Sequence, residues 1–163
     1  MIEDPLIVNR IGHPYFSTPE RRQKLVAVAR GWLGTPFHAH GRVKGAGVDC
    51  VHLWGEIMTE AGHLRNGYEF PGYYVDGGHH AGTSPLNEWL GSHQGFRELS
   101  FADRLEPGDL CTYRIGRQPW HLAGCLGFPV GLHVMEGGSV CEMHFDDSTF
   151  AKRLCSVFRP IVW

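Results

Sequence analysis

The heptapeptide GVDCVHL, Gly47–Leu53, joins a glycine-rich stretch to a segment whose apolar residues have helical spacing. The residues on that apolar face are Leu53, Trp54, Ile57, Met58 and Ala61. Asp49 is a favourable N-cap residue, and Gly62 is a favourable residue at which to end a helix. We therefore expect a helix from about Asp49 to Gly62, with Cys50 in its first turn.

This position gives the Cys50 thiol a distinctive electrostatic setting. The first turn of a helix presents unpaired N–H groups and the positive end of the helix dipole, which together stabilise an anion. A thiolate gains from this setting, and the thiolate is the nucleophilic form of cysteine. The carboxylate of Asp49 opposes a lowered thiol pKa unless it faces away. The alternative is that Cys50 is a small buried apolar residue without a chemical role, as most free cysteines are.

The chain has the size and composition of one globular domain, with 163 residues of which 42% are hydrophobic. Its formal net charge of -2 gives no basic field, so we expect no nucleic-acid partner. No apolar run approaches the roughly 20 residues that span a bilayer, and MIEDPLIVNR at the start lacks the basic leader of a signal peptide. The five cysteines do not form the dense even pattern of a disulfide scaffold, so we expect most of them to be reduced.

Two more helices are expected on either side of the Cys50 helix. Residues 17–34, STPERRQKLVAVARGWLG, have the apolar spacing of an amphipathic helix, and Ser17 followed by Glu20 is a helix-start signal. Ser84 and the proline after it start a short helix over 84–90. The first half of the chain is therefore predicted to be helical.

The second half is predicted to be rich in strands. Residues 35–47 and 65–83 lack periodicity and contain many turn-forming residues, which indicates irregular connections. Short apolar segments separated by glycines follow: DLCTYRI (109–115), HLAGCLGF (121–128), GLHVMEG (131–137), SVCEMHF (139–145) and LCSVFRPIVW (154–163). We interpret them as consecutive antiparallel strands of a meander, which gives an α+β fold with N-terminal helices packed on a C-terminal antiparallel sheet.

A nucleophilic cysteine needs a base, and the base needs an orienting partner. The chain contains eleven histidines, so closeness in sequence to Cys50 means little. His121 and His133 are better candidates because each lies in a predicted strand, and neighbouring strands would bring their side chains together. Periodicity alone does not show that they face Cys50. Other candidate partners for His121 are Glu136, Glu142 and His144.

Several short motifs occur in an order typical of one family. They are GWLGTPF (31–37), GVDC (47–50), EPGDL (106–110), HLAGCLG (121–127) and LHVMEGGSV (132–140). In this order they resemble the NlpC-type cell-wall peptidases, a papain-like cysteine hydrolase family, over about Ala27 to Val140. The spacer HAHGRVKGAGVDC is most similar to the branch found in phages, prophages and gene-transfer-agent tail clusters. The expected domain organisation is one NlpC-type domain over residues 1–163, with 1–18 as an N-terminal extension.

The resemblance implies a catalytic set and a mechanism. It implies Cys50 as the nucleophile at a helix N-terminus, His121 as the general base and His133 as the residue that orients His121. Cys50, as a thiolate paired with imidazolium His121, would attack an amide carbonyl and form a thioester that water releases. The oxyanion would meet N–H groups at the helix start, and no metal or organic cofactor is expected. Four residues are candidates for contact with the substrate: Asp49, Phe37, His38 and Trp120.

The implied substrate is a peptidoglycan stem peptide, cleaved after γ-D-glutamate, and in such family members the acid before the nucleophile helps to hold the substrate's free amine. Without a signal peptide, we expect the protein to be made in the bacterial cytoplasm. It would act at the cell wall or in the periplasm as part of a phage tail or phage-like particle, with phage-tail proteins as partners. A lytic role with a separate export route, or a cytoplasmic enzyme that recycles imported wall peptides, also fits the sequence.

Three departures from the family pattern leave alternatives open. Many members have Ser-Gly after the Asp-Cys pair where this chain has Val51 and His52, and many have tyrosine where this chain has Phe37. His38 or His40 could supply the missing hydrogen-bond donor. The alternatives are a non-catalytic phage-tail binding module of the same fold, and an amidase or acyltransferase that acts on a substrate outside the wall.

The remaining conspicuous residues have simpler interpretations. The histidines do not form the ligand pairs typical of structural zinc sites, so we expect no metal site. Trp32, Trp54 and Trp89 lie on apolar helix faces and are expected in the core. The aromatic segment 68–76 could either line a cleft or pack inside. Arg42 is expected to be a solvated loop charge.

Overall fold

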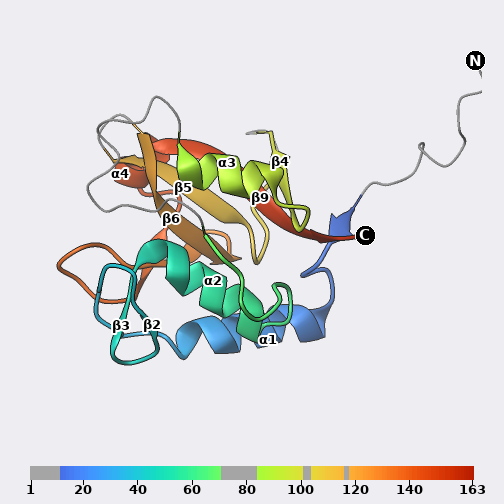
Figure 1. The fold of residues 1–163 in the computed structure, drawn as a ribbon. Helices are drawn as coiled ribbons and strands as arrows, with labels where there is room; N and C mark the ends of the chain where they lie inside the picture. Colours follow the sequence, from blue (N-terminus) through green and yellow to red (C-terminus); the bar gives the residue numbers. More distant parts are fainter. Residues whose placement is uncertain (1–11, 71–83, 101–103, 116–117) are drawn as a thin grey trace, which may run out of the picture.

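The structure of the protein is a computed structural model that describes residues 12–70, 84–100, 104–115 and 118–163. Two layers are evident in Figure 1: helices α1 and α2 lie on one side of an antiparallel sheet, with α2 next to the sheet and α1 outside it. The α+β class predicted from the sequence is confirmed. None of the described helices is long and apolar enough to cross a membrane.

Helix α1 spans Pro19–Arg30, as the apolar pattern predicts. Its N-cap is Thr18 rather than the expected Ser17, because the Thr18 side chain accepts a hydrogen bond from the N–H of Arg21 at 3.3 Å. Leu25 and Ala29 are fully buried and hold the helix against α2.

Helix α2 spans Cys50–Glu60 and is the central helix of the fold. The side chain of Asp49 caps its start, and Gly62 beyond its end has a φ of 92°, a left-handed conformation that favours glycine. All the apolar residues predicted for its buried face are at most 2% exposed: Leu53, Trp54, Ile57, Met58 and Ala61. The prediction of this helix from the stretch around Cys50 is therefore confirmed.

The stretch 35–47, predicted as a loop, contains an additional hairpin. Strands β2 (Arg42–Val43) and β3 (Gly47–Val48) pair antiparallel directly before α2. The hairpin is only two residues long on each side, too short to produce a period-two apolar pattern.

A seven-stranded sheet forms the second half of the fold, in the order β1-β9-β5-β6-β7-β8, with β4 also pairing with β9. The strands are β1 (His13–Pro14), β4 (Phe96–Leu99), β5 (Leu110–Ile115), β6 (Gln118–Gly127), β7 (Val130–His133), β8 (Cys141–His144) and β9 (Leu154–Val162). Two short helices complete the fold: α3 (Pro85–Ser92), capped by Ser84 as predicted, and α4 (Ser148–Ala151). Residues 13–16, which we expect in an N-terminal extension, pair with β9 or pack in the core.

The meander prediction is correct for β5 to β8 and wrong for β9. Strand β9 lies beside β5 instead of β8. A buried ion pair fixes this arrangement: Arg159 of β9 donates from Nε to Oδ1 of Asp109 at 2.9 Å and from Nη2 to Oδ2 at 2.8 Å. Asp109 is fully buried just before β5, so it requires a charged partner at this place.

The sheet has an apolar cluster on each face. Leu122 and Leu126 of β6 belong to the large cluster that contains α2, whereas Ala123 and Cys125 belong to a smaller cluster with Tyr113. This alternation follows from the period of two along a strand.

Candidate active site

Cys50 is the first residue of α2 and is 4% exposed. Its position at the helix start is as predicted, so its sulfur lies where backbone N–H groups of the first turn lack helical acceptors. The N–H of His52 is one of these groups, and the Asp49 carboxylate satisfies it. The first turn is thus held by the residue directly before the cysteine.

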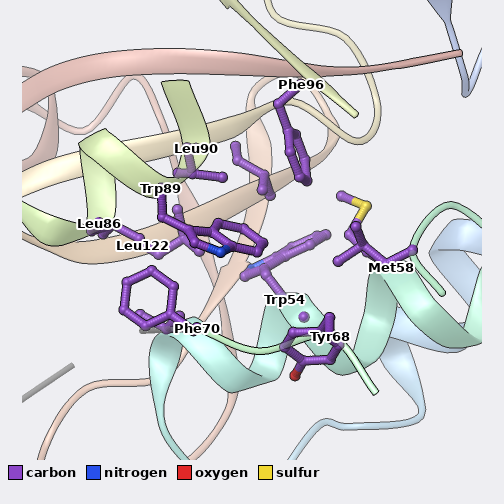
Figure 2. Close-up of a pocket in the computed structure, with 13 residues that line it drawn as sticks. Trp54, Met58, Tyr68, Phe70, Leu86, Trp89, Leu90, Phe96 and Leu122 are labelled. Atoms are coloured by element: carbon purple, nitrogen blue, oxygen red, sulfur yellow. The ribbon is translucent and has the colours of Figure 1, made fainter. Parts of the chain in front are cut away.

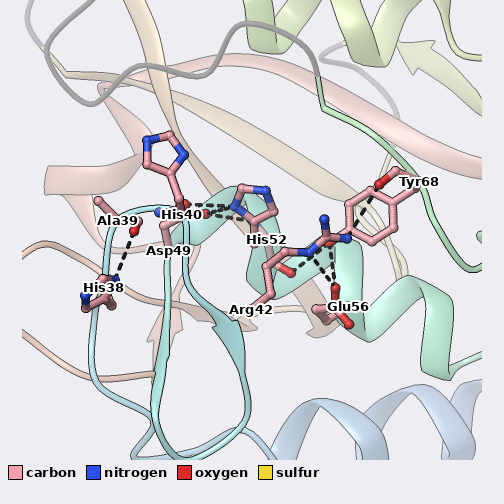
Figure 3. Close-up of polar contacts among 8 residues, drawn as sticks. All are labelled: His38, Ala39, His40, Arg42, Asp49, His52, Glu56 and Tyr68. Atoms are coloured by element: carbon pink, nitrogen blue, oxygen red, sulfur yellow. Dashed lines mark hydrogen bonds and ion pairs between the residues drawn. The ribbon is translucent and has the colours of Figure 1, made fainter.

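The Asp49 carboxylate is fully buried and is engaged by its own chain (Figure 3). Its Oδ1 accepts from the N–H of His52 at 2.8 Å, and its Oδ2 accepts from the N–H of His40 at 2.8 Å. The Nδ1 of His52 lies 2.9 Å from Oδ1 and 2.8 Å from Oδ2. Because a carboxylate accepts and does not donate, Nδ1 carries the hydrogen in these contacts. Two histidines therefore contribute to holding one carboxylate beside Cys50.

His40 has the left-handed conformation needed to reach this carboxylate. Its φ is 61°, the only positive value of a non-glycine residue among the described residues. Such a conformation is unfavourable for most residues and persists where surrounding contacts enforce it. Here the bond from the His40 N–H to Asp49 is such a contact.

The two loop residues expected to contact substrate lie next to β3. Phe37 is half-buried, forms a parallel bridge with Val48 and packs against the core. His38 is exposed, and its Nδ1 lies 3.0 Å from the carbonyl oxygen of Ala39. Both residues contact Val48, two residues before Cys50, since the N–H of His38 donates to the carbonyl of Val48 at 3.1 Å.

Segment 34–38 also connects the start of α2 to the turn that follows β7. The N–H of Val48 donates to the carbonyl of Pro36 at 3.0 Å, and Pro36 pairs with Ser139. On the other side, the N–H of Phe37 donates to the carbonyl of Gly138 at 2.9 Å. The backbone before Cys50 is thus tied to the turn just beyond His133.

His121 and His133 come together as the sequence predicts. Their side chains lie on neighbouring strands β6 and β7, with His121 Nε2 2.9 Å from His133 Nδ1. Both are nearly buried, at 3% and 6% exposed. The ring of His121 lies near Tyr113, and the ring of His133 packs edge-on against Phe150. Tyr113 belongs to the smaller apolar cluster, and Phe150 packs against that cluster.

Burial changes the protonation of this pair. Burial, together with the neighbouring His133, lowers the pKa of His121 to about 3, and burial lowers the pKa of His133. Both imidazoles are therefore neutral at pH 7. A neutral imidazole can accept a proton, so His121 has the protonation state of a general base, and its lowered pKa makes it a weaker base than a free imidazole. The preformed imidazolium expected from the sequence is disfavoured by this burial.

Helix α2 is fixed on strands β6 and β7 through Trp54, one turn after Cys50. The indole N–H of Trp54 donates to the carbonyl of Leu132 at 3.0 Å. The indole ring lies on Gly124, where an added Cβ would be 2.1 Å from the ring. A glycine at position 124 is what allows α2 to approach the sheet this closely.

The other candidate partners of His121 are engaged elsewhere. Glu142 pairs with Arg30 at 3.3 Å, and His144 lies 3.8 Å from Asp146. Glu136 is exposed. The side chain of Trp120, expected to contact substrate, lies outside the described part of the structure.

The sequence interpretation missed a second polar cluster on α2. Arg42, expected to be a solvated charge, donates from Nε to Glu56 at 3.0 Å and lies over the Tyr68 ring at 4.4 Å (Figure 3). The Tyr68 hydroxyl also donates to Glu56 at 3.1 Å. These residues are 12 to 26 positions apart in the chain, so no local pattern predicts the cluster. The Asp49–His52 pair, three residues apart at a helix start, could have been predicted from its spacing.

Trp32 and Trp54 lie in the core, as predicted, whereas Trp89 is only partly buried. Tyr68 and Phe70 pack against this core, and the rest of the aromatic segment 68–76 lies outside the described residues. Within the described ranges, no three side chains of the types that hold metals gather at one place.

No protein-family model matches the chain, and no curated protein matches it. Solved structures do. The NlpC/p60 domain of the peptidoglycan hydrolase SagA is 20% identical with a TM-score of 0.53, and the match covers 87% of this chain and 98% of that one. The chain has the fold of NlpC/p60 domains.

Two larger structures contain the same fold. A protein similar to a lipoprotein of the NLP/P60 family, from Staphylococcus aureus subsp. aureus Mu50, is 15% identical with a TM-score of 0.64, over 95% of this chain and 45% of that chain. An NlpC/P60 family protein from Bacillus cereus is 19% identical with a TM-score of 0.62, over 86% and 40%. The chain thus spans less than half the length of these two proteins.

Proposed function

We propose that this protein is a cysteine peptidase that hydrolyses amide bonds in the stem peptides of peptidoglycan. One observation carries the proposal: a cysteine at the start of the central helix and a buried, neutral His121–His133 pair occur together on the NlpC/p60 fold. The solved domain with this fold that matches over nearly its whole length belongs to a peptidoglycan hydrolase.

In the proposed reaction, His121 takes the proton of the Cys50 thiol as the sulfur attacks the amide carbonyl. The oxyanion is stabilised by N–H groups of the first turn of α2. Protonated His121 then gives its proton to the leaving amine, which leaves a thioester on Cys50. Water hydrolyses the thioester, with His121 again as base, and the peptide acid and free enzyme are released. The proposal requires the thiol to reach His121, which pairs with Tyr113 of β5 next to the point where the β5–β6 register shifts.

Within this proposal, the main role of Asp49 is structural, because it holds the first turn of α2. Its oxygens accept hydrogen bonds from His52 and His40, and its side chain is fully buried. Direct contact with a substrate amine would require Asp49 to exchange these partners. Phe37 and His38 lie near the same helix start and are proposed to contact substrate, together with Trp120.

The finer parts of the proposal rest on the sequence resemblance. They are cleavage after γ-D-glutamate, action at the cell wall or in the periplasm, and a role in wall penetration with phage-tail partners.

A digest of purified sacculi tests the chemistry directly, since each cut releases a new amine and a new carboxylate that mass spectrometry of the soluble fragments can locate.

The decisive comparison uses two cysteine variants. Cys50→Ala should abolish release of fragments, whereas Cys141→Ala should leave it unchanged because Cys141 is exposed and is not in the proposed mechanism. Release of the same fragments by Cys50→Ala would refute the proposed nucleophile. A folded wild-type protein that releases no fragments would favour the alternative of a non-catalytic binding module.

A further inference from the structure

The structure contains a polar groove at the end of α2 opposite to Cys50. The groove has a volume of about 770 Å³ and lies between the segment after α2 and the end of α3. It is lined by His63, Leu64, Arg65, Asn66, Gly67, Tyr68, Trp89, Ser92, His93 and Gln94. With 11 residues in α2, the two ends of this helix are roughly 16 Å apart. None of the groove's lining residues belongs to the proposed catalytic set, and only Tyr68 among them reaches back toward the start of α2, with its hydroxyl 3.4 Å from the carbonyl of His52.

The walls of the groove are fixed by hydrogen bonds to their surroundings. The indole N–H of Trp89 donates to the carbonyl of Glu69 at 3.0 Å, which ties α3 to the segment after α2. The Tyr68 hydroxyl is held by Glu56, and the N–H of Gly95 donates to Nδ1 of His93 at 2.9 Å. Preformed walls reduce the entropy lost when a ligand binds.

An apolar pocket adjoins the groove and closes its inner side. Figure 2 shows Trp54 and Trp89 pointing into this pocket from α2 and α3, with Tyr68 and Phe70 along one side. The pocket has a volume of about 20 Å³, which is room for about one water molecule. Of these two, the groove alone is large enough for a ligand, and Leu64, Tyr68 and Trp89 line both.

The side chains that line the groove offer several hydrogen-bond donors beside the acceptor oxygens of their amides and hydroxyls. None of the ten lining residues is acidic, and Arg65 carries a full positive charge. The described residues provide no hydrogen-bond or ion-pair partner for the side chains of Arg65, Asn66 and Gln94. Burial lowers the pKa of His93, so its ring is neutral, and because Nδ1 accepts from Gly95, the ring hydrogen is on Nε2.

We propose that this groove binds a carboxylate of the wall polymer's peptide, at a site distinct from the one where the amide bond is cut. The guanidinium of Arg65 offers a planar pair of donors that matches a carboxylate, and the amides of Asn66 and Gln94 can complete its hydrogen bonding. The identity of the polymer rests on the proposed function, whereas the carboxylate follows from the groove's own donors. Two attachment points on one polymer would increase binding to sacculi over binding to small fragments.

Binding can be measured on the full chain carrying Cys50→Ala, which prevents turnover. The probe is the set of disaccharide-peptides that a muramidase releases from purified sacculi, compared with the same fragments after their carboxylates are converted to amides. Backbone amide NMR signals of residues 63–68 and 92–94 should shift with the acidic fragments and not with the amidated ones. Arg65→Gln should weaken binding roughly tenfold, the effect of losing one charged hydrogen-bonding partner.

Arg153→Gln is the matched control, because Arg153 is exposed and does not line the groove. Its binding should equal that of the parent protein. Equal binding by Arg65→Gln and the control, equal binding of the amidated fragments, or shifts confined to the region of Cys50 would overturn the proposal.

The groove and the proposed peptidase activity can fail separately. Binding of acidic fragments in the groove, by a protein that does not cut sacculi, would leave the groove assignment standing and refute the activity. Cutting of sacculi that Arg65→Gln does not slow, with groove signals that do not shift, would refute the groove and leave the activity standing.

Discussion

The imidazole of His52 lies 2.8 Å from the carboxylate of Asp49, three residues earlier, in the first turn of the helix that begins with Cys50. The Asp49 side chain is fully buried and the His52 side chain is 11% exposed, so solvent screens their interaction little. This pair gives the histidine at position 52 a structural role at the start of α2. Its backbone N–H and its ring both bind the carboxylate that caps the turn containing Cys50.

A double-mutant cycle measures this interaction. Asp49→Ala removes the helix cap and one member of a buried pair, and should lower the free energy of unfolding by about 3 kcal/mol. His52→Ala should lower it by about 2 kcal/mol, because the buried carboxylate loses one partner but keeps two N–H donors. The double variant should lose less free energy of unfolding than the two single losses added together, by about 1 kcal/mol or more. Urea unfolding gives all three values.

The control for the cap alone is Asp147→Ala. Asp147 caps α4 by accepting from the N–H of Thr149 at 2.8 Å, and it is exposed. Its replacement should lower stability by about 1 kcal/mol. Strict additivity of the Asp49 and His52 variants would show that the pair contributes no coupling energy.

The close packing of α2 on the sheet can be tested at Gly124. A Cβ at this position would lie 2.1 Å from the Trp54 ring, which is fully buried and cannot move aside easily. Gly124→Ala should therefore lower the free energy of unfolding by about 3 kcal/mol, the upper range for an overpacked core. Chemical denaturation followed by tryptophan fluorescence checks this value.

Gly91 is the matched glycine for this prediction. It lies in α3, and a Cβ there would have its nearest neighbour at 3.9 Å, an ordinary contact. Gly91→Ala should be neutral or stabilise the protein by about 0.5 kcal/mol, since alanine favours a helix. Equal changes in the free energy of unfolding for the two substitutions would mean that the Trp54 ring does not restrict the space at position 124.

Local patterns in the sequence predict the elements but not all of their pairings. The helix that begins at Cys50 is predictable because its cap, apolar face and terminal glycine all lie within 14 residues, 49–62. The pairing of β9 with β5 is not predictable from local patterns, because the ion pair that joins them links Asp109 and Arg159, which are 50 residues apart. A meander is the simplest arrangement when only neighbouring segments are considered.

The same division applies to the candidate site. The contact between His121 and His133 was predictable because the two residues occupy neighbouring strands joined by a short turn. The neutral protonation state of these two histidines was not predictable, because it follows from their burial, which the sequence does not specify. Whether Cys50 and His121 react together stays a prediction. It rests on the order of the sequence motifs that contain the two residues.

Burial of His63 should make the fold sensitive to acid. Its Nε2–H donates to the carbonyls of Gly95 at 2.9 Å and Ile161 at 3.3 Å, and its Nδ1 is buried with no partner among the described residues. Burial lowers the pKa of His63 in the folded state. A proton on Nδ1 would have no acceptor, so the folded state favours the neutral ring.

The sign of the pH effect follows from this shift. The unfolded chain binds the proton near pH 6.5 and the folded chain only at lower pH, so stability is complete above pH 6.5 and is lost as the pH falls below it. His121 and His133 act in the same direction. Each histidine contributes a slope of up to about 1.4 kcal/mol per pH unit.

Urea unfolding between pH 7 and pH 4 measures the slope. His63→Gln should flatten it, because the glutamine amide can still donate to the carbonyls but does not titrate. His144→Gln, at an exposed position, should leave the slope as in the wild type. A slope that His63→Gln leaves unchanged would show that His63 does not titrate in this range.

The hydrogen bond between His121 and His133 can run in either direction, and the direction decides which nitrogen of His121 is basic. Two neutral imidazoles share one hydrogen across this 2.9 Å contact, so one nitrogen donates and the other accepts. If His121 Nε2 donates, its Nδ1 is left as the basic atom and His133 acts only as an acceptor. Asparagine offers a carbonyl oxygen at nearly the position of Nδ1. His133→Asn should therefore retain most of the rate of sacculus digestion, while His133→Ala loses roughly a hundredfold and His121→Ala loses nearly all. An asparagine amide can also donate from its NH2 group, so it can replace His133 in either direction of this bond. Comparable losses in His133→Asn and His133→Ala would therefore refute the orienting role proposed for His133.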